Sequence, residues 1–259
     1  MVLFALTLNK NILSPIFSIK FGGIIWKIEV NDKYDLIAIE SRSLESKKTS
    51  FSVINFKTGE ILIKEKIFKE TWNLNLAYIA EKNLILTAYG QSGSPESKGI
   101  ISVNIKDAEV LWEHYNLSLN KANDEGLQVF DPRINPRRLS WINHIKGENM
   151  AESDIIEYSN KTLIYPEFRT QFSIPDFILR GEIAGDLSVL SFRDLTIISF
   201  HEKIQNNIQQ RLLVYQHDTI LLDEILIRGI QKLQPESFFM QKNHLFYIRN
   251  KNEIVSYLV

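Results

Sequence analysis

The chain has 259 residues, of which 30 are basic and 31 acidic, so its formal net charge is −1. This balance excludes the basic excess of a nucleic-acid clamp, and the absence of cysteine excludes disulfides, thiol catalysis and cysteine-ligated metal sites. Hydrophobic residues make up 44% of the chain, which argues against disorder, and no apolar run approaches the ~20 residues of a membrane span.

The chain begins with an apolar segment, Met1–Leu8. No basic residue precedes it and no pair of small residues follows at a cleavage spacing, so it is not typical of a secretory signal. We expect a buried β-strand here and a cytoplasmic protein.

Short segments rich in β-branched and aromatic residues then recur along the chain, separated by polar turns. The clearest are Ile24–Val30, Asp35–Ser41, Phe51–Phe56, Ile61–Ile67, Asn73–Ala80, Asn83–Tyr89, Gly99–Ile105 and Val110–Tyr115. The best helical candidate, Asp223–Lys232, fits a strand equally well. The sequence therefore predicts an all-β chain.

One hairpin pattern repeats: an apolar residue, a four-residue polar turn, and a second apolar residue five positions after the first. Its first apolar positions are Leu8, Phe56, Ile105, Tyr158 and Tyr215, spaced 48, 49, 53 and 57 residues apart. A second hairpin lies in each interval; in the third we expect Gly126–Phe130 with Arg138–His144, and at the end Ser237–Gln241 with His244–Asn250. Four strands in about 50 residues is the period of a β-propeller blade.

We therefore predict a single propeller domain over residues 1–259, with five four-stranded blades and a ring closed by the N- and C-terminal strands. In this interpretation Met1–Phe17 completes the last blade, to which Ile254–Val259 could add a strand. Two β-sandwiches or an irregular barrel remain the alternatives.

The turn also carries a family signature. Ser102, Asn104, Asp107, Ala108 and Trp112 keep the spacing A-x-D-x-x-T-G-x-x-x-W, which resembles the blade motif of quinoprotein-type propellers. Asn55, Thr58 and Gly59 keep the turn without the tryptophan. The second copy of the turn, with Pro95, Lys98, Gly99 and Ile100 just before it, also looks like an uncharacterised group of bacterial propeller-like proteins of about this length. The resemblance covers residues 20–115. The resemblance implies fold more than activity.

The signature has a physical basis at three points. Asn55 and Asn104 precede the turn, where their side chains can accept hydrogen bonds from turn amides. Gly59 suits a positive φ, and we expect Trp112 to pack between neighbouring blades.

Residues that carry chemistry are sparse. The five histidines, His114, His144, His201, His217 and His244, form no metal-binding spacing, and no phosphate-binding or nucleophile motif is present. We expect no cofactor and no metal.

Candidate binding residues fall in two groups. Asp131–Arg138 carries three arginines that could clamp an anion, or pair with nearby carboxylates, and we place this segment between the inner strands of the third blade. The second group consists of residues whose positions in the strands place them near the mouth of the predicted propeller's central channel. Trp26 and Trp72 also have such positions, although these two residues are more typical of a core. The candidates are Trp72, Asn73, Asp124, Glu125, Gln128, Asp131, Arg133, Arg137, Arg138 and Trp141.

Loop lengths favour one binding face. The polar segments Arg42–Thr49, Gln91–Lys98, Lys146–Ser153 and Glu202–Gln210 are predicted to be long second-to-third connections on one rim, where binding residues concentrate. The leading hypothesis is a monomeric, non-enzymatic scaffold that binds a protein or peptide partner through this rim.

Two other functions remain open. A small hydrolase or lyase acting on a carbohydrate or other small molecule would need Asp124, Glu125 or Asp131 to converge with a histidine such as His144. The third possibility is a catalytically silent relic of a sensor module.

Overall fold

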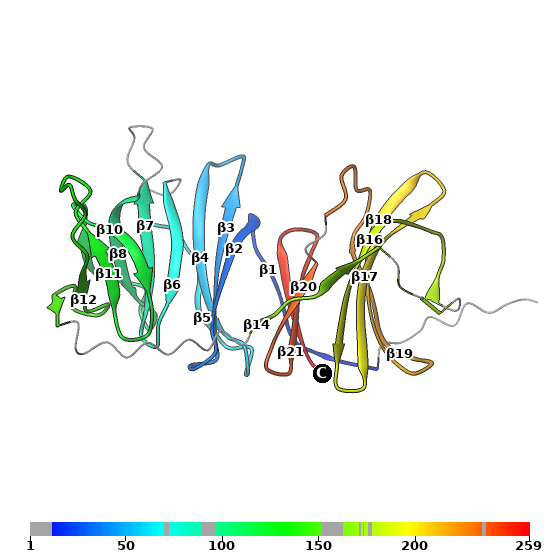
Figure 1. The fold of residues 1–259 in the computed structure, drawn as a ribbon. Coiled ribbons are helices and arrows are strands. Elements are labelled where there is room, and N and C mark those ends of the chain that lie inside the picture. The colour runs from blue at the N-terminus through cyan, green and yellow to red at the C-terminus, as the bar shows by residue number, and fades with distance from the viewer. Residues whose placement is uncertain are drawn as a thin grey trace, which may run out of the picture. The chain divides into compact units, whose positions relative to one another are not determined.

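The computed structural model describes residues 12–69, 73–89, 97–151, 163–170, 172, 174–175, 178–234 and 237–259. Its regular elements are β-strands, all paired antiparallel, and no α-helix occurs in these ranges (Figure 1). None of the described residues forms a helix long and apolar enough to cross a membrane. The chain divides into two compact units, Phe21–Lys161 and Met1–Lys20 with Thr162–Val259.

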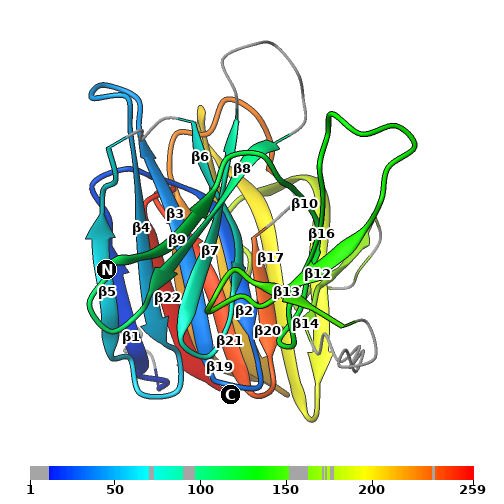
Figure 2. The same cartoon turned by 90° about the vertical axis from the view of Figure 1, so that its left-hand side faces the viewer.

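The unit of residues 21–161 contains three four-stranded sheets, in each of which consecutive strands are neighbours. The first sheet consists of β2 (Ile24–Asn31), β3 (Leu36–Ser43), β4 (Lys48–Asn55) and β5 (Ile61–Lys66). The second consists of β6 (Leu74–Ile79), β7 (Asn83–Tyr89), β8 (Ser97–Asn104) and β9 (Val110–His114). The third consists of β10 (Ser118–Ala122), β11 (Leu127–Phe130), β12 (Ser140–Ile142) and β13 (Asn149–Met150) (Figure 2).

The other unit contains two five-stranded sheets. One has the order β15 (Glu167–Arg169), β16 (Glu182–Phe192), β17 (Leu195–Ile204), β18 (Asn207–Gln216) and β19 (Thr219–Ile227). The other has the order β1 (Pro15–Lys20), β22 (Glu253–Leu258), β21 (His244–Arg249), β20 (Phe238–Gln241) and β14 (Leu163–Ile164). In the second sheet the N-terminal strand β1 therefore pairs with the C-terminal strand β22.

Side chains of alternate parity on the middle strands enter different cores, as the two-residue period of a strand requires. In β7, Leu84 and Leu86 belong to a core shared with the first sheet, whereas Ile85 belongs to a core shared with the third. In β17, Ile197 packs in the core shared with the β20–β22 sheet, while Ile198 packs on the opposite face. The second sheet is therefore the middle layer of three stacked sheets, whereas in the described part of the chain the opposite face of the β15–β19 sheet is covered by the segment of Ile174 and Ile178 and not by another sheet.

The predicted side-chain caps and positive φ of the repeated turn are confirmed. Asn55 Oδ1 accepts hydrogen bonds from the amides of Lys57 and Thr58 at 3.1 Å, and Asn104 Oδ1 accepts one from Lys106 at 3.0 Å. Gly59 has φ +77°.

The third copy of this turn lies elsewhere than predicted. Asn143 Oδ1 accepts hydrogen bonds from the amides of Ile145 and Lys146, both at 2.9 Å, and Gly147 has φ +71°. The turn joining β12 and β13 is thus the equivalent of the two earlier ones. Of the copy centred on Tyr158, residues 152–162 lie outside the described part of the chain, and Leu163–Ile164 forms β14 instead.

This shift moves the whole third repeat by one strand. Gly126–Phe130 covers the second strand β11, and Arg138–His144 covers the third strand β12; they were predicted as the first and second. The segment Asp131–Arg138 therefore joins the second and third strands. The polar residues of this long connection separate the apolar segments of β11 and β12, which therefore look like the first hairpin of the repeat. The short first strand β10 was missed for this reason.

Two of the predicted long loops are wrong. Strand β3 continues to Ser43 and strand β4 begins at Lys48, so a tight turn joins them. Likewise, strand β17 continues to Ile204 and strand β18 begins at Asn207. Polar residues fill these strand ends, which made them look like loops. Most of Gln91–Lys98 lies outside the described residues, and Lys146–Ser153 begins in the third-to-fourth turn. Asp223–Lys232 lies partly in β19.

Candidate functional site

The first strand of each sheet in residues 21–161 contains a β-bulge. In β2 the cross-strand pairs step from Ile25 to Lys27, in β6 from Leu76 to Tyr78, and in β10 from Leu119 to Lys121. The bulge residues without a cross-strand partner are Trp26, Ala77 and Asn120. A bulge redirects the side chains beside it and occurs often next to functional sites.

These bulges border a cavity of about 610 Å³. Its lining comes from β2, β6, β7, β10, β11 and the β11–β12 connection. The three residues that follow the bulges, Lys27, Tyr78 and Lys121, all contribute to it. The volume falls in the range of ordinary ligand sites, so this cavity is the candidate functional site.

The charged groups that line the cavity are mostly cationic. Lys27, Lys121 and Arg137 carry positive charge and Glu29 carries the one carboxylate among the lining residues. Lys27 Nζ lies 2.9 Å from Glu29 Oε1 and donates a hydrogen bond of 2.9 Å to the Leu76 carbonyl. The Arg137 guanidinium stacks 4.5 Å from the Phe130 ring centroid. These contacts fix one cation on β2 and one on the β11–β12 connection.

A polar network supports Tyr78 from behind the lining. Its hydroxyl donates a hydrogen bond of 2.7 Å to Asp124 Oδ1, which also accepts one of 2.6 Å from Asn31 Nδ2. Burial raises the pKa of Tyr78, and the hydrogen bond to Asp124 raises it further. Tyr78 therefore remains a neutral donor. The Asp124 carboxylate ties the first, second and third sheets together.

His144 occupies the turn position that holds Phe56 and Ile105 in the two earlier copies. Its Nδ1 lies 2.8 Å from Asn83 Oδ1, and its Nε2 lies 3.0 Å from the Asp124 carbonyl oxygen. Burial lowers its pKa, against the opposing effect of the Asp124 hydrogen bond. The ring bridges the second and third sheets, and both nitrogens are engaged away from Asp124's carboxylate.

The structure separates the predicted arginines. Arg133 forms hydrogen bonds to both carboxylate oxygens of Asp131, at 2.6–3.2 Å, and these bonds lower the pKa of Asp131 to about 2. The alternative of local pairing is thus confirmed for Arg133. Arg137 lines the cavity, and Arg138 is exposed.

The remaining predicted residues are not among those that line the cavity. Asn73 is exposed before β6, and Glu125 lies in the β10–β11 turn. Gln128 Oε1 accepts a hydrogen bond of 2.6 Å from Asn120 at the third bulge. Trp141 is buried in β12. Trp72 lies outside the described residues, and a binding role for any of these positions stays a prediction.

The two tryptophans given structural expectations behave differently. Trp112 packs with the core between the second and third sheets and donates a hydrogen bond of 3.2 Å to the His144 carbonyl, as expected of an inter-sheet aromatic. Trp26 was expected in a core but is 64% exposed. The bulge in β2 turns its ring outward, where the Arg42 guanidinium lies 4.9 Å from the ring centroid.

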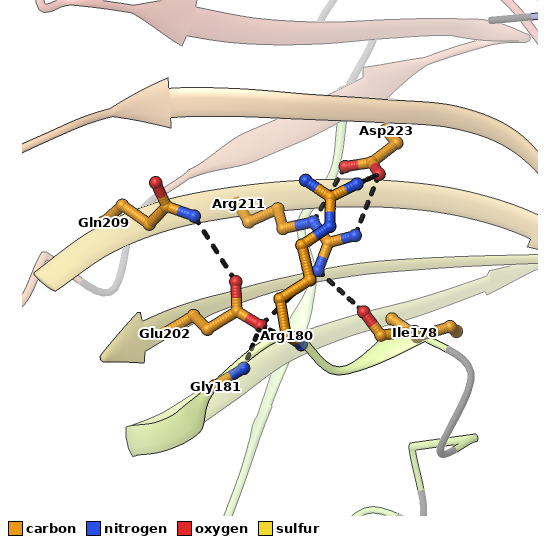
Figure 3. Close-up of polar contacts among 7 residues, drawn as sticks. All are labelled: Ile178, Arg180, Gly181, Glu202, Gln209, Arg211 and Asp223. Carbon is orange, nitrogen blue, oxygen red and sulfur yellow. Dashed lines mark hydrogen bonds and ion pairs between the residues drawn. The ribbon is translucent and has the colours of Figure 1, made fainter. Parts of the chain in front are cut away.

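A second polar cluster lies in the β15–β19 sheet (Figure 3). Arg211, 1% exposed, binds Asp223 with two hydrogen bonds of 2.8 Å and donates one of 2.7 Å to the Ile178 carbonyl. Arg180 also pairs with Asp223, and Glu202 accepts hydrogen bonds from the Arg180 and Gly181 amides at 2.6 and 2.9 Å. The positive and negative charges balance and the groups bind one another, so this cluster is structural.

Sequence reasoning missed Lys27, Tyr78 and Lys121, because a bulge leaves no mark in single-sequence periodicity. Among the described residues, no group of three or more histidine or acidic side chains is placed to hold a metal ion.

Residues 30–112 match the model of a domain of unknown function, DUF4905. This match covers the end of β2 and the strands up to β9, about a third of the chain. No curated protein matches the chain.

Several solved structures are similar to the chain at low identity. BamB from Moraxella catarrhalis matches with 11% identity and a TM-score of 0.34, covering 96% of this chain and 100% of that one. The β-propeller domain of the Trilobed protease from Pyrococcus furiosus matches with 11% identity and a TM-score of 0.33, over 88% and 64%. Raptor from Chaetomium thermophilum matches with 10% identity and a TM-score of 0.36, over 96% and 29%.

One of these three structures is described as a β-propeller domain, and these descriptions give no support to the quinoprotein type.

Proposed function

We propose that the chain is a non-enzymatic β-propeller scaffold whose cavity on the first strands binds a protein or peptide partner. Each of the five sheets is then one blade, and the pairing of β1 with β22 supports closure by strands from both chain ends. Cores on both faces of β7 support stacking of the first three blades, and the core shared by β17 with the β20–β22 sheet supports stacking of the last two. A single domain, a monomer and a cytoplasmic location complete the proposal.

The cavity carries this proposal. First strands line the axis of a propeller, and here three of them share one bulge position that directs Lys27, Tyr78 and Lys121 into the same space. A repeated bulge beside a cavity supports a binding role. The binding face is therefore the first-strand side rather than the long-loop rim of the sequence hypothesis.

The observations do not favour a hydrolase or lyase. Such an enzyme needs a carboxylate and an acid or base directed at a substrate. The Asp124 carboxylate already accepts hydrogen bonds from Asn31 and Tyr78, and both His144 nitrogens face protein oxygens. Asp131 is occupied by Arg133.

A cavity-filling substitution tests the proposal. Ala77→Trp and Asn120→Trp each add an indole at a bulge, and Lys57→Trp adds one to an exposed turn outside the cavity as a matched control. The full chain and each folded variant are used as bait in a native extract. We expect the same partner to be lost with both cavity variants and retained with the control. Identical partner profiles for all four proteins would contradict the proposal.

A further inference from the structure

One extended segment covers the edges of two sheets in the unit that contains Thr162–Val259. Strand β14 pairs with β20, and strand β15 pairs with β16. Only Tyr165 and Pro166 lie between β14 and β15, so the stretch Leu163–Arg169 serves both sheets, and we call it the edge segment. Without the edge segment, β16 and β20 would each stand last in a four-stranded sheet, with unpaired backbone groups along that side.

The side chains of the edge segment are mostly exposed. Ile164, Tyr165 and Phe168 are 38%, 64% and 55% exposed, and all three residues of β15 are exposed. A ring contact joins Tyr165 to Phe239 of β20, with the centroids 6.4 Å apart. The residues that face the edge segment in register on β16 and β20 are all buried. The segment therefore covers these strands mainly through its backbone, over two cross-strand pairs in β14 and three in β15.

An edge held in this way can be opened and refilled. An element with few buried apolar contacts belongs to the least stable part of a fold. Its backbone pairing does not depend on sequence, so another extended chain can form the same hydrogen bonds to the same edges. Opening uncovers Leu187, Val189 and Met240, which are at most 3% exposed. The chain that replaces the edge segment must therefore bring apolar side chains to cover them.

We propose that the edge segment is an internal ligand of β16 and β20, and that an extended apolar peptide segment of a partner protein replaces it. The edge segment is then an autoinhibitory contact, because the partner has to displace it before strand pairing begins. This inference concerns a different unit from the one that contains the cavity, and it does not rest on the proposed function.

Tethering sets how strongly the edge segment competes with a partner. A segment attached to the same chain reaches an effective concentration on the order of mM, so a free peptide of the same sequence binds the wild-type chain weakly. When the edge segment cannot pair, this competition disappears. We therefore expect a peptide that copies residues 162–170 to bind at least about tenfold more tightly to a chain whose edge segment is disabled.

The first measurement is hydrogen exchange of the full chain. The sequence has no cysteine, so Phe168→Cys with Ser188→Cys introduces one defined disulfide between residues that are paired in register. Phe168→Cys alone is the matched control. We expect the amides of the edge segment to exchange at least about 100-fold faster than those of β17, and the disulfide to slow them at least about tenfold until it is reduced. Equal exchange of the edge segment and β17 would overturn the proposal.

The second measurement is binding of the labelled peptide, followed by fluorescence anisotropy. The disabled chain carries Ile164→Pro and Phe168→Pro, which remove two amides from the edge segment. The control peptide is N-methylated at the positions of Ile164, Glu167, Phe168 and Arg169, so it cannot donate the ladder hydrogen bonds. We expect the disabled chain to bind the unmodified peptide most tightly, the reduced double-cysteine chain to bind it weakly, and the oxidised one not at all. If the proline variant does not fold, the oxidised and reduced forms make the same comparison.

Four results would overturn the proposal. Equal binding by the oxidised and reduced forms would place the peptide on another surface, and equal binding of the two peptides would replace strand pairing with side-chain contacts. Loss of binding with Ala77→Trp would place the peptide in the cavity. Absence of binding to both the disabled chain and the reduced form would leave the edges without an external ligand. The proposed function fails separately, if its partner profile is unchanged by Ala77→Trp.

Discussion

Replacing Arg211 with methionine is the sharpest test of what holds the β15–β19 sheet together. The guanidinium is 1% exposed and makes two hydrogen bonds to Asp223, one to the Ile178 carbonyl and an ion pair of 3.5 Å with Glu202. Methionine retains much of the side-chain volume but none of these interactions. Two carboxylates then lose their buried cation.

The expected magnitude follows from what each carboxylate keeps. Removing one partner of a buried ion pair costs about 3–5 kcal/mol. Here Asp223 keeps Arg180, and Glu202 keeps the Arg180 and Gly181 amides. We therefore expect a loss near the lower end, about 3 kcal/mol. Arg211→Lys keeps the positive charge but not the paired hydrogen bonds of the guanidinium, so it should lower the free energy of unfolding by less than Arg211→Met does.

Urea unfolding followed by circular dichroism measures this loss, with Arg228→Met, an exposed arginine after β19, as the matched control. If the free energy of unfolding falls by about 2 kcal/mol per molar urea, the urea midpoint of the unit that contains the β15–β19 sheet should decrease by roughly 1.5 M. Asp223→Asn in the Arg211→Met background should recover part of the loss. A change within about 0.5 kcal/mol of the control would refute the structural role assigned to the cluster.

Three further predictions concern the repeated turns and pH. Gly147→Ala should destabilise the chain by about 1–3 kcal/mol, because φ is +71° and a Cβ would lie 2.8 Å from the Trp112 ring. Ala108 occupies the equivalent turn position at φ +59°, so Ala108→Gly should stabilise the chain by up to about 1 kcal/mol. The urea midpoint should therefore fall for the first variant and rise for the second. Burial lowers the pKa of His144, so the unfolded chain binds its proton first; the free energy of unfolding should fall as pH drops below about 6.5, and His144→Asn should flatten that slope. Hydrogen bonds from Arg249 lower the pKa of Glu253 to about 2, so the contribution of Glu253 to the free energy of unfolding is complete above about pH 4.5 and disappears towards pH 2. If Glu253→Gln left the fall of stability between about pH 4.5 and pH 2 unchanged, this prediction would be contradicted.

The strands and turns of the first two sheets could be predicted because their information is local. Asn55 and Asn104 each precede a turn that needs an acceptor for its amides, and the apolar residues on either side alternate with the strand period. The third turn carries the same signal, Asn143 with Gly147 and Glu148. It went unrecognised because His144 stands where the hydrophobic pattern requires an apolar residue.

The cavity could not be predicted because its geometry depends on register. A bulge adds one residue to one strand, and only the cross-strand pairs show that Trp26, Ala77 and Asn120 are equivalent. Their identities have nothing in common: an indole, a methyl group and an amide. Strand position placed Trp26 near the channel mouth, whereas its residue type favoured a core, and its ring at the bulge is exposed.

His144 shows how one position of a repeat can make polar contacts where its counterparts are apolar. At the equivalent turn positions Phe56 and Ile105 fill space in the core, whereas the imidazole links Asn83 of the second sheet to the Asp124 backbone of the third. Asp124 in turn orients the Tyr78 hydroxyl beneath the cavity. A repeat that only needed packing would hold an apolar residue here, at no desolvation cost. The imidazole therefore joins the second and third sheets through two polar contacts that an apolar residue at this position does not make.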